Sequence, residues 1–282
     1  MNYYVIIPAY NEDAFIGAML ESLSSQTVLP AKAIVVNDNS TDATGMIAER
    51  FAEKHTWLSV VNTQSDAIHL PGSKVIQAFN AGFDTVDNRY DIIVKLDADL
   101  ILPRDYFETI LKAFASDTRV GMAGGFAYIE KNGRWILESL TDKDHIRGAF
   151  KAYRKELFQQ MGGLRAAMGW DTADELLAKF YGWKVITIGT LKVKHLKPTG
   201  ANYDKTARYK QGAAFYTLGY GLLITSIAGA KLALKKKKPL LFFDYIKGYF
   251  KAQKEGKEML VTPEQAKFIR KYRWKKMKEK IF

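Results

Sequence analysis

Residues 91–99 read Asp-Ile-Ile-Val-Lys-Leu-Asp-Ala-Asp, an apolar run that ends in two aspartates one residue apart. The β-branched run predicts a buried strand over 91–96. Two carboxylates at the end of such a strand can both reach one hard cation, usually Mg²⁺ or Mn²⁺, which neutralises a diphosphate. A solvated, capped loop can have the same residues, so Asp97 and Asp99 alone leave both interpretations open.

Short β-branched runs alternate with helical patterns before this stretch. We expect strands over 3–7, 33–36 and 57–61, and helices over 11–25, from Asp42 onward with a buried stripe of Met46, Ile47 and Phe51, and over 72–83. Repeated β-α-β units predict an α/β fold in which helices cover both faces of a mostly parallel sheet.

Polar residues cluster where three of these strands end, at 8–12, 37–42 and 97–99. Because ligands of such sheets bind at the carboxyl ends of the strands, the clusters predict one site at that edge. Asp38 could accept the ring N–H of a uracil or guanine there, or it could cap the following helix. Asp42 is better placed as the cap.

The second half of the chain is less regular. We expect a strand over 120–129, helices over 149–161 and 171–181, two strands over 184–189 and 191–195, and helices from residue 203 onward. Asp171 and Asp174 open a helix, where the dipole favours a carboxylate whatever its role. Trp170 could form an apolar wall that raises the pKa of a general base. His195 is either a structural hydrogen-bonding residue or, beside Asp99, a ligand of the same cation.

Composition and charge narrow the function classes. The chain has 282 residues, 48% of them apolar, and no cysteine, which excludes a disulfide framework and a cysteine nucleophile. Its first residues lack a basic region and a long apolar stretch, so we expect no secretory signal and a cytoplasmic protein. Residues 231–282 hold 17 Lys and Arg against 5 Asp and Glu, which accounts for the whole net charge of +12. Residues 1–230 therefore carry no net charge, which argues against nucleic acid as a partner.

The order of motifs along the chain resembles that of family 2 glycosyltransferases of the bacterial type, which have the GT-A fold. The motifs are 8–12, 37–42, Asn80-Ala81-Gly82, 97–99, Gly162-Gly163 and the acidic turn before Gly182-Trp183, and the resemblance covers about residues 3–200. It implies a UDP- or GDP-linked sugar as donor, a divalent cation (Mn²⁺ or Mg²⁺), and an inverting transfer to an acceptor hydroxyl.

The resemblance also implies roles for single residues. The donor would contact Pro8, Tyr10, Glu12, Asp38 (base), Lys74, Asp97 (ribose or diphosphate) and Ala98. Asp99 and His195 would hold the metal, Asp171 would be the catalytic base with Asp174 as the alternative, and Met168 and Trp170 would face the acceptor. This chain has Trp170-Asp171 where the family usually has Glu-Asp. It also lacks a later Gln-x-x-Arg-Trp motif, which argues against a processive polysaccharide synthase.

Two other function classes compete with this interpretation. A sugar nucleotidyltransferase uses a similar nucleotide site, but it usually begins with a glycine-rich, basic loop, which residues 8–12 do not provide. A non-enzymatic basic membrane-binding module would explain residues 231–282 and would leave the acidic strand ends unexplained.

We expect two domains, a GT-A domain over 1–202 and a basic helical extension over 203–282. We also expect transfer to a soluble acceptor to survive deletion of residues 231–282. Residues 211–230 are uncharged and about as long as a membrane span, but glycine, threonine and serine lower their hydropathy. Because lysine clusters flank amphipathic segments, we expect a peripheral protein on the inner face of the cell membrane, bound to anionic lipid. Its acceptor would be lipid-linked or an envelope glycan. The alternative is that 211–230 packs into a soluble core or a dimer interface.

Overall fold

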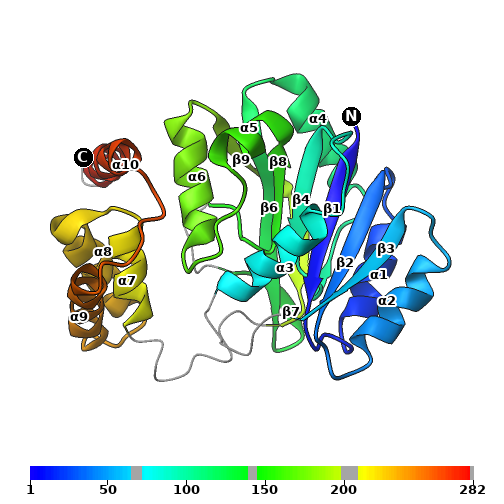
Figure 1. Cartoon of the computed structure of the whole chain (residues 1–282), viewed down its shortest axis with the longest axis horizontal. Helices are drawn as coiled ribbons and strands as arrows, with labels where there is room; N and C mark the ends of the chain where they lie inside the picture. Colours follow the sequence, from blue (N-terminus) through cyan, green and yellow to red (C-terminus); the bar gives the residue numbers. More distant parts are fainter. Residues whose placement is uncertain (65–71, 139–144, 198–208, 280–282) are drawn as a thin grey trace. The chain divides into compact units, whose positions relative to one another are not determined.

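The computed structural model describes residues 1–64, 72–138, 145–197 and 209–279 (Figure 1). The chain divides into two compact units. The first comprises residues 1–166 and 181–199, and the second comprises 167–180 and 200–282. The predicted boundary at 202–203 lies outside the described residues.

A nine-stranded mixed sheet, counted over the described residues, forms the centre of the first unit. Its order is β3-β2-β1-β4-β8-β6-β9-β5, with β7 paired to β6. The strands are β1 (Tyr3–Ala9), β2 (Lys32–Asp38), β3 (Leu58–Thr63), β4 (Ile92–Leu96), β5 (Leu100–Ile101), β6 (Val120–Lys131), β7 (Arg134–Leu137), β8 (Phe150–Arg154) and β9 (Lys184–His195). Strands β3, β2, β1 and β4 are parallel to one another, as are β6 and β9, whereas the remaining pairs are antiparallel. The fold is the predicted α/β fold, with a sheet that is mixed rather than mostly parallel.

Helices cover both faces of this sheet. They are α1 (Ile16–Ser24), α2 (Thr44–Ala52), α3 (Ser73–Phe83), α4 (Tyr106–Ser116) and α5 (Lys155–Met161). On one face of β1, Tyr3 stacks on Phe107 of α4 with 4.5 Å between ring centroids. On the other face, Gly82 of α3 lies so close to Ile6 and Val36 that a Cβ atom there would overlap both. An apolar strand covered in this way needs no polar face, which explains why β1 is buried along its whole length.

Two elements of the second half differ from the prediction. The helix predicted over 149–161 is wrong in its first part, where β8 pairs antiparallel with β4. Neighbouring strands bury every residue of β8, so tertiary pairing decides this segment. The two strands predicted over 184–189 and 191–195 are one strand, β9, whose pairing with β6 shifts register between Gly124 and Phe126.

The first helix and strand also differ at their ends. The helix predicted over 11–25 begins only at Ile16, because Asn11 has a positive φ of 51° and a turn precedes the helix. β1 continues through Pro8, where the prediction ended it. Its pairing with β4 stops at Ile6, so β2 is the one strand that borders Pro8, a position where a missing N–H is tolerated.

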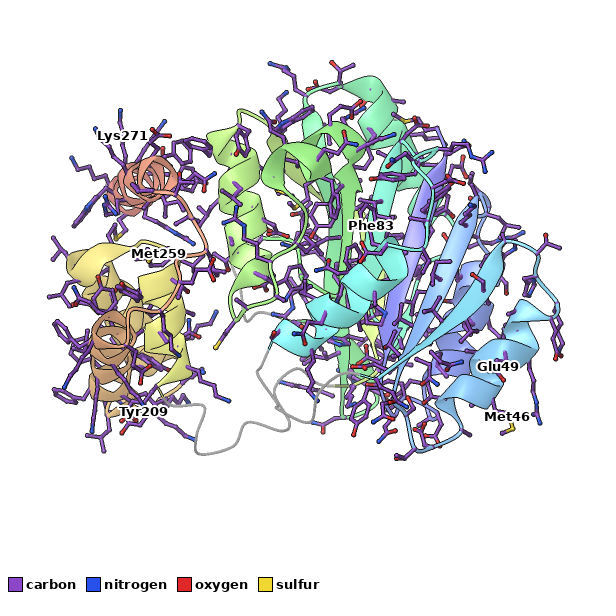
Figure 2. The ribbon with its side chains drawn as sticks, in the orientation of Figure 1. Met46, Glu49, Phe83, Tyr209, Met259 and Lys271 are labelled. Atoms are coloured by element: carbon purple, nitrogen blue, oxygen red, sulfur yellow. The ribbon has the colours of Figure 1, made fainter. Side chains whose placement is uncertain are left out.

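The buried face of α2 differs from the predicted one. Met46, predicted in a stripe with Ile47 and Phe51, is 50% exposed (Figure 2). The helix instead buries Thr44 and Ala48. These small side chains allow α2 to lie close to the sheet.

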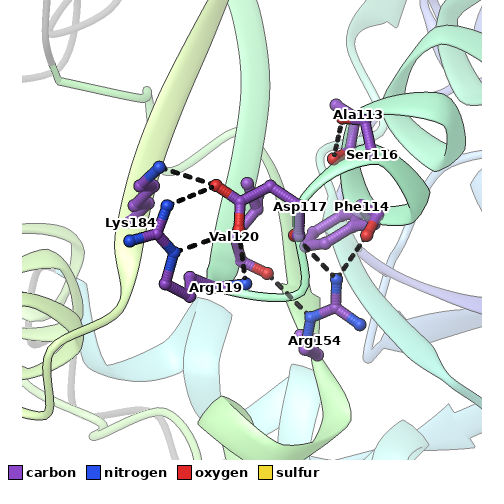
Figure 3. Close-up of polar contacts among 8 residues, drawn as sticks. All are labelled: Ala113, Phe114, Ser116, Asp117, Arg119, Val120, Arg154 and Lys184. Atoms are coloured by element: carbon purple, nitrogen blue, oxygen red, sulfur yellow. Dashed lines mark hydrogen bonds and ion pairs between the residues drawn. The ribbon is translucent and has the colours of Figure 1, made fainter.

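Ion pairs and hydrogen bonds tie α4 to neighbouring strands (Figure 3). Asp117, directly after α4, accepts from Lys184 Nζ of β9 at 2.6 Å and also pairs with Arg119. The buried Arg154 side chain of β8 donates to the carbonyl oxygen of Phe114 at 2.6 Å. The hydrogen bond from Lys184, together with those from Arg119, holds the pKa of Asp117 well below its usual range.

The second unit is helical over its described residues. Its helices are α6 (Trp170–Phe180), α7 (Lys210–Thr217), α8 (Gly221–Lys235), α9 (Leu241–Lys254) and α10 (Pro263–Lys278). A Cβ atom at Gly212 of α7 would lie 1.8 Å from the Tyr245 carbonyl oxygen of α9, so these two backbones are in direct contact. The rings of Phe180 and Phe268 join α6 to α10, with 5.5 Å between centroids.

The uncharged stretch 211–230 is divided between α7 and α8. Gly219 and Gly221 have positive φ angles of 69° and 72°, which turn the chain between the two helices. Among the described residues, no helix is both long enough and apolar enough to cross a bilayer.

Candidate active site

Asp97 and Asp99 follow β4 at the carboxyl edge of the sheet. β5 begins at Leu100, which pairs with His195 at the end of β9. Asp99 Oδ2 consequently lies 3.3 Å from His195 Nε2, and both residues are buried. Antiparallel pairing of β5 with β9 therefore brings the two predicted metal ligands together.

Acidic side chains surround His195. Burial lowers the pKa of the imidazole, but the hydrogen bond and charge of Asp99 and the charges of Asp97 and Glu138 outweigh this, so the pKa lies above its usual range. Within the described part of the chain, His195 Nδ1 is buried and has no hydrogen-bond partner. Negative charge gathered in this way favours a bound cation.

Glu12 joins this group from the loop after β1. Its Oε1 accepts from Lys197 Nζ at 2.9 Å, while its Oε2 is buried and, among the described residues, has no partner. Burial raises the pKa of Glu12, Lys197 opposes the shift, and the charges of Asp99 and Asp97 add to it. A buried carboxylate oxygen without a partner beside two aspartates is a vacant acceptor at the site.

Lys95 is a charged group of the site that the sequence motifs did not single out. It is 1% exposed, contacts Asp97 through its ammonium group, and lies opposite Lys151 of β8, which is 0% exposed. Burial raises the pKa of Asp97, the Lys95 charge opposes this, and the charge of Asp99 adds to it. The sequence did contain one signal for this ion pair, which is a lysine within an otherwise apolar strand. Because a buried ammonium needs a counter-charge, such a lysine predicts an acidic partner nearby.

The loops after β1 and β2 are held together by backbone-to-side-chain bonds. Asn11 N donates to Ser40 Oγ at 3.1 Å, and Thr41 N donates back to Asn11 Oδ1 at 2.8 Å. Glu12 N donates to Thr44 Oγ1 at 2.7 Å. These bonds fix Glu12 between the two strand ends, so the side chain is positioned by loops as well as by the sheet.

Asp38 is the last residue of β2 and is 5% exposed. Its Oδ1 accepts from Thr63 Oγ1 of β3 at 3.3 Å. The N–H of Thr44 at the start of α2 donates to Asp42 Oδ1 at 2.9 Å, so Asp42 rather than Asp38 serves that helix end. Asp38 is therefore not needed as a cap.

The other predicted donor residues lie in different surroundings. Pro8 is buried at the end of β1, and Ala98 is 3% exposed. Tyr10 is 59% exposed, and Lys74 is half-buried in the first turn of α3. Only Tyr10 and Lys74 of this set have side chains available for extensive contact with a ligand.

The two predicted metal ligands, Asp99 and His195, lie close together. Among the described residues, no group of three or more His, Asp and Glu side chains is arranged to hold a metal ion. The 3.3 Å between Asp99 Oδ2 and His195 Nε2 suits two neighbouring ligands of one cation with bonds of about 2.1 Å. Mg²⁺ is commonly held by one or two carboxylates and completes its shell with substrate phosphates and water, so Asp99 suits such a cation, whereas the His195 nitrogen is a softer ligand than Mg²⁺ prefers.

The predicted base and acceptor residues lie in the second unit, on or beside α6. Asp171 is half-buried, and its charge contributes to raising the pKa of the buried Tyr220, after burial as the main cause. Asp174 is 4% exposed and accepts from the Glu175 backbone N–H at 2.6 Å. Trp170 is 7% exposed and Met168 is half-buried. Of the two aspartates, Asp171 has more surface to meet an acceptor.

Comparison with known proteins adds to this geometry. The family model for glycosyl transferase family 2 matches residues 4–168. The chain belongs to this family. Glycosyltransferase GlyA of Streptococcus pneumoniae serotype 4 is 28% identical over 141 residues, which are 49% of this chain and 19% of GlyA. This family 2 chain thus matches less than half the length of that relative.

Two solved structures share the fold of this family 2 chain. The mannosyltransferase PcManGT from Pyrobaculum calidifontis, in complex with GDP-Man and Mn²⁺, has a TM-score of 0.60 and 19% identity over 95% of this chain and 78% of its own. GalNAc-T7 with UDP, GalNAc and Mn²⁺ has a TM-score of 0.63 and 11% identity over 82% of this chain and 50% of its own. The fold is of the GT-A type, and the predicted family is confirmed.

Proposed function

We propose that this chain is an inverting, cation-dependent glycosyltransferase that moves a sugar from a UDP- or GDP-linked donor to an acceptor hydroxyl. The buried Asp99–His195 pair, 3.3 Å apart at the carboxyl edge of the sheet, carries the proposal. The donor class is supported by the fold neighbours, whose structures contain GDP-Man in one case and UDP in the other, each with Mn²⁺.

The donor would lie along the strand ends. Asp38 would accept the base N–H, Asp97 would meet the ribose or diphosphate, and Lys74 would approach the donor from α3. Asp99 and His195 would hold Mn²⁺ or Mg²⁺, which offsets the negative charge that develops on the leaving diphosphate. Glu12 Oε2, which has no partner among the described residues, could accept a further hydrogen bond from the nucleotide sugar or from water.

Transfer would be one displacement with Asp171 as the base. The acceptor hydroxyl oxygen attacks the anomeric carbon as its proton passes to the Asp171 carboxylate. The bond from that carbon to the diphosphate oxygen breaks, and the nucleoside diphosphate leaves with the electron pair. Attack on the face opposite the leaving group inverts the configuration. Trp170 and Met168 would contact the acceptor.

The basic C-terminal part supports a proposal for the acceptor and the location. Residues 231–282 carry 17 Lys and Arg against 5 Asp and Glu, and each basic residue near an anionic leaflet contributes about 1 kcal/mol to binding. We place the protein as a peripheral protein on the cytoplasmic face of the cell membrane. The acceptor there would be lipid-linked or an envelope glycan.

Nucleotide-sugar turnover tests the proposal. UDP- and GDP-sugars are screened with Mn²⁺, with Mg²⁺ and with EDTA, and we expect turnover only with a cation. Asp99→Asn should lower turnover by about two orders of magnitude, because the cation supplies several kcal/mol of transition-state stabilisation. Asp84→Asn, at an exposed position after α3, is the matched control. Turnover in EDTA, or an Asp99→Asn variant as active as the control, would overturn the metal assignment.

A further inference from the structure

The outward face of α8 is apolar although it is exposed. Leu223, Ile227 and Leu234 are 63%, 39% and 70% exposed. Spacings of four and seven residues place them in one stripe along the helix. The buried residues of α8 are Ile224, Thr225, Gly229 and Ala233, so the helix packs against the rest of the unit away from this stripe. Large exposed apolar side chains gathered in one stripe are unusual on a protein surface, so the stripe calls for an occupant.

The apolar stripe continues into α9. Leu240 and Phe243 are 76% and 67% exposed. They follow Leu234 after a short turn, and α8 and α9 pack against each other within the same unit (Figure 1). We call this surface the α8–α9 corner, which comprises Leu223, Ile227, Leu234, Leu240, Phe243 and the lysines 235–238.

The turn at this corner concentrates positive charge. Lys235 to Lys238 are four consecutive exposed lysines, and residues 221–254 contain eight lysines against one acidic residue, Asp244. Burial and the neighbouring charge of Lys238 lower the pKa of Lys236, so these ammonium groups lie close to one another. The cluster is therefore suited to a surface with many negative charges.

Lys237 occupies a backbone position that favours glycine. It follows the end of α8 with a positive φ of 54°, where glycine is the usual residue and a side chain costs conformational energy. Lys238 N donates to the Ala233 carbonyl at 3.0 Å, which closes the helix end in this strained form. This turn places the lysine run between α8 and α9.

We propose that the α8–α9 corner is the surface with which this protein docks on an anionic lipid bilayer. Leu234, Leu240 and Phe243 enter the apolar layer, while lysines 235–238 meet the lipid phosphates. A bilayer interface offers both chemistries side by side, negative at its surface and apolar beneath. A second copy of the chain would set lysines against lysines across a two-fold axis. The inference rests on the peripheral location in the proposed function and names the residues that produce it.

Co-sedimentation of the full chain with vesicles tests this surface. One set contains equal parts of phosphatidylcholine and phosphatidylglycerol, and the other contains phosphatidylcholine alone. We expect binding to the anionic set that weakens with salt. Changing Lys235, Lys236, Lys237 and Lys238 together to Gln should weaken it by more than about tenfold, since each lysine near the surface contributes about fivefold. The triple variant L234S/L240S/F243S should weaken it by a similar factor even at low salt.

Matched controls remove the same chemistry elsewhere. Changing Lys267, Lys271, Lys275 and Lys278 of α10 to Gln removes four exposed lysines, and L29S/M46S removes exposed apolar side chains from the first unit. Both controls should bind like the unaltered protein. Corner variants that bind as well as the controls would overturn the assignment, as would an unaltered protein that does not prefer anionic vesicles. A corner variant that converts a dimer to a monomer in light scattering, with vesicle binding unchanged, would instead identify a second copy as the occupant.

Nucleotide-sugar turnover is measured on every variant with a soluble acceptor. Retained turnover in variants that no longer bind vesicles supports a docking surface that is separate from the chemistry. Absence of turnover in the unaltered protein would overturn the proposed function. The vesicle experiment would still show whether the α8–α9 corner binds anionic lipid.

Discussion

Lys95 has an almost completely buried charge at the site. Its side chain is 2% exposed and contacts Asp97. Lys95→Met keeps most of the volume but leaves Asp97 without this counter-charge, so we expect the free energy of unfolding to fall by about 3 kcal/mol. Urea denaturation measures the change. Lys32→Met removes a half-exposed partner of Asp87 at 2.7 Å and should cost about 1 kcal/mol at most. Equal losses in the two variants would contradict this role of Lys95.

We expect Asp171 to act in the chemistry of transfer and Asp174 to stabilise the fold. Asp171→Asn should lower kcat for transfer by about 10² to 10⁴ with an unchanged KM for the donor, since only proton acceptance is lost. Asp174→Asn changes a buried carboxylate and should lower the free energy of unfolding by about 1–3 kcal/mol. Transfer kinetics and urea denaturation are measured on both. If Asp174→Asn lowers kcat while the fold is unaffected, the base is Asp174.

Single residues of the site could be predicted only where a motif or a resemblance pointed to them. Asp99 and His195 were expected together, and the structure places them together, while their ligand roles stay predictions. Glu12 was expected to meet the donor, but its ion pair with Lys197 joins residues far apart in the chain, and no local pattern shows it. The role of Lys95 at the site was not predicted, because its apolar neighbours already predicted a buried strand and drew no attention to the lysine.

At the level of elements, prediction succeeded where the pattern is local. The helix predicted over 72–83 is observed over Ser73–Phe83, since its apolar positions repeat at helical spacing. Segment 150–154 was predicted as helix, because its apolar residues continue the spacing of the helix that follows, but its pairing partner β4 lies far away in the sequence. Antiparallel pairing across that distance could not be predicted from local residues.

Asp117 links elements that lie far apart in the sequence, and its effect should depend on pH. Its pKa in the folded protein is well below the unfolded value of about 3.9, so its ionised form stabilises the fold above that pH. The stabilisation is lost as the pH falls below about 4 toward the folded pKa. We expect Asp117→Asn to lower the urea midpoint at pH 7, and the difference from the unaltered protein to shrink at lower pH. A constant difference across that range would contradict the ion-pair explanation.

For the whole molecule, the basic part of the chain is not a separate tail. Residues 167–180 form one compact unit with 200–282, and α10 packs on α6 through Phe268 and Phe180. Because α6 carries Asp171, the proposed base, loss of α10 could affect transfer; the expectation that transfer does not need residues 231–282 stays a prediction. The charge asymmetry seen in the sequence describes where the lysines lie, and it does not mark a domain boundary.

Ending the chain at Leu260 removes α10 and tests the alternative that transfer needs this helix. We expect nucleoside-diphosphate affinity in titration calorimetry to change little, because the proposed donor residues lie in residues 1–166. Transfer should fall by about two orders of magnitude, since a small displacement of a catalytic group has such an effect. Phe268→Leu in the full chain keeps an apolar cover on α6 and should stay active. Full transfer by the shortened chain would show that α10 is dispensable for catalysis.

The pairing of Leu100 with His195 has a consequence for how the protein folds. A strand that slips by one residue turns each of its side chains to the other face of the sheet, so His195 meets Asp99 in one register only. The two residues are far apart in the chain, and contacts of that kind form slowly because closing so long a loop costs entropy before the contact contributes any stability. The ability to bind a cation would then appear late in folding, and it would indicate that β9 pairs with β5 in the native register.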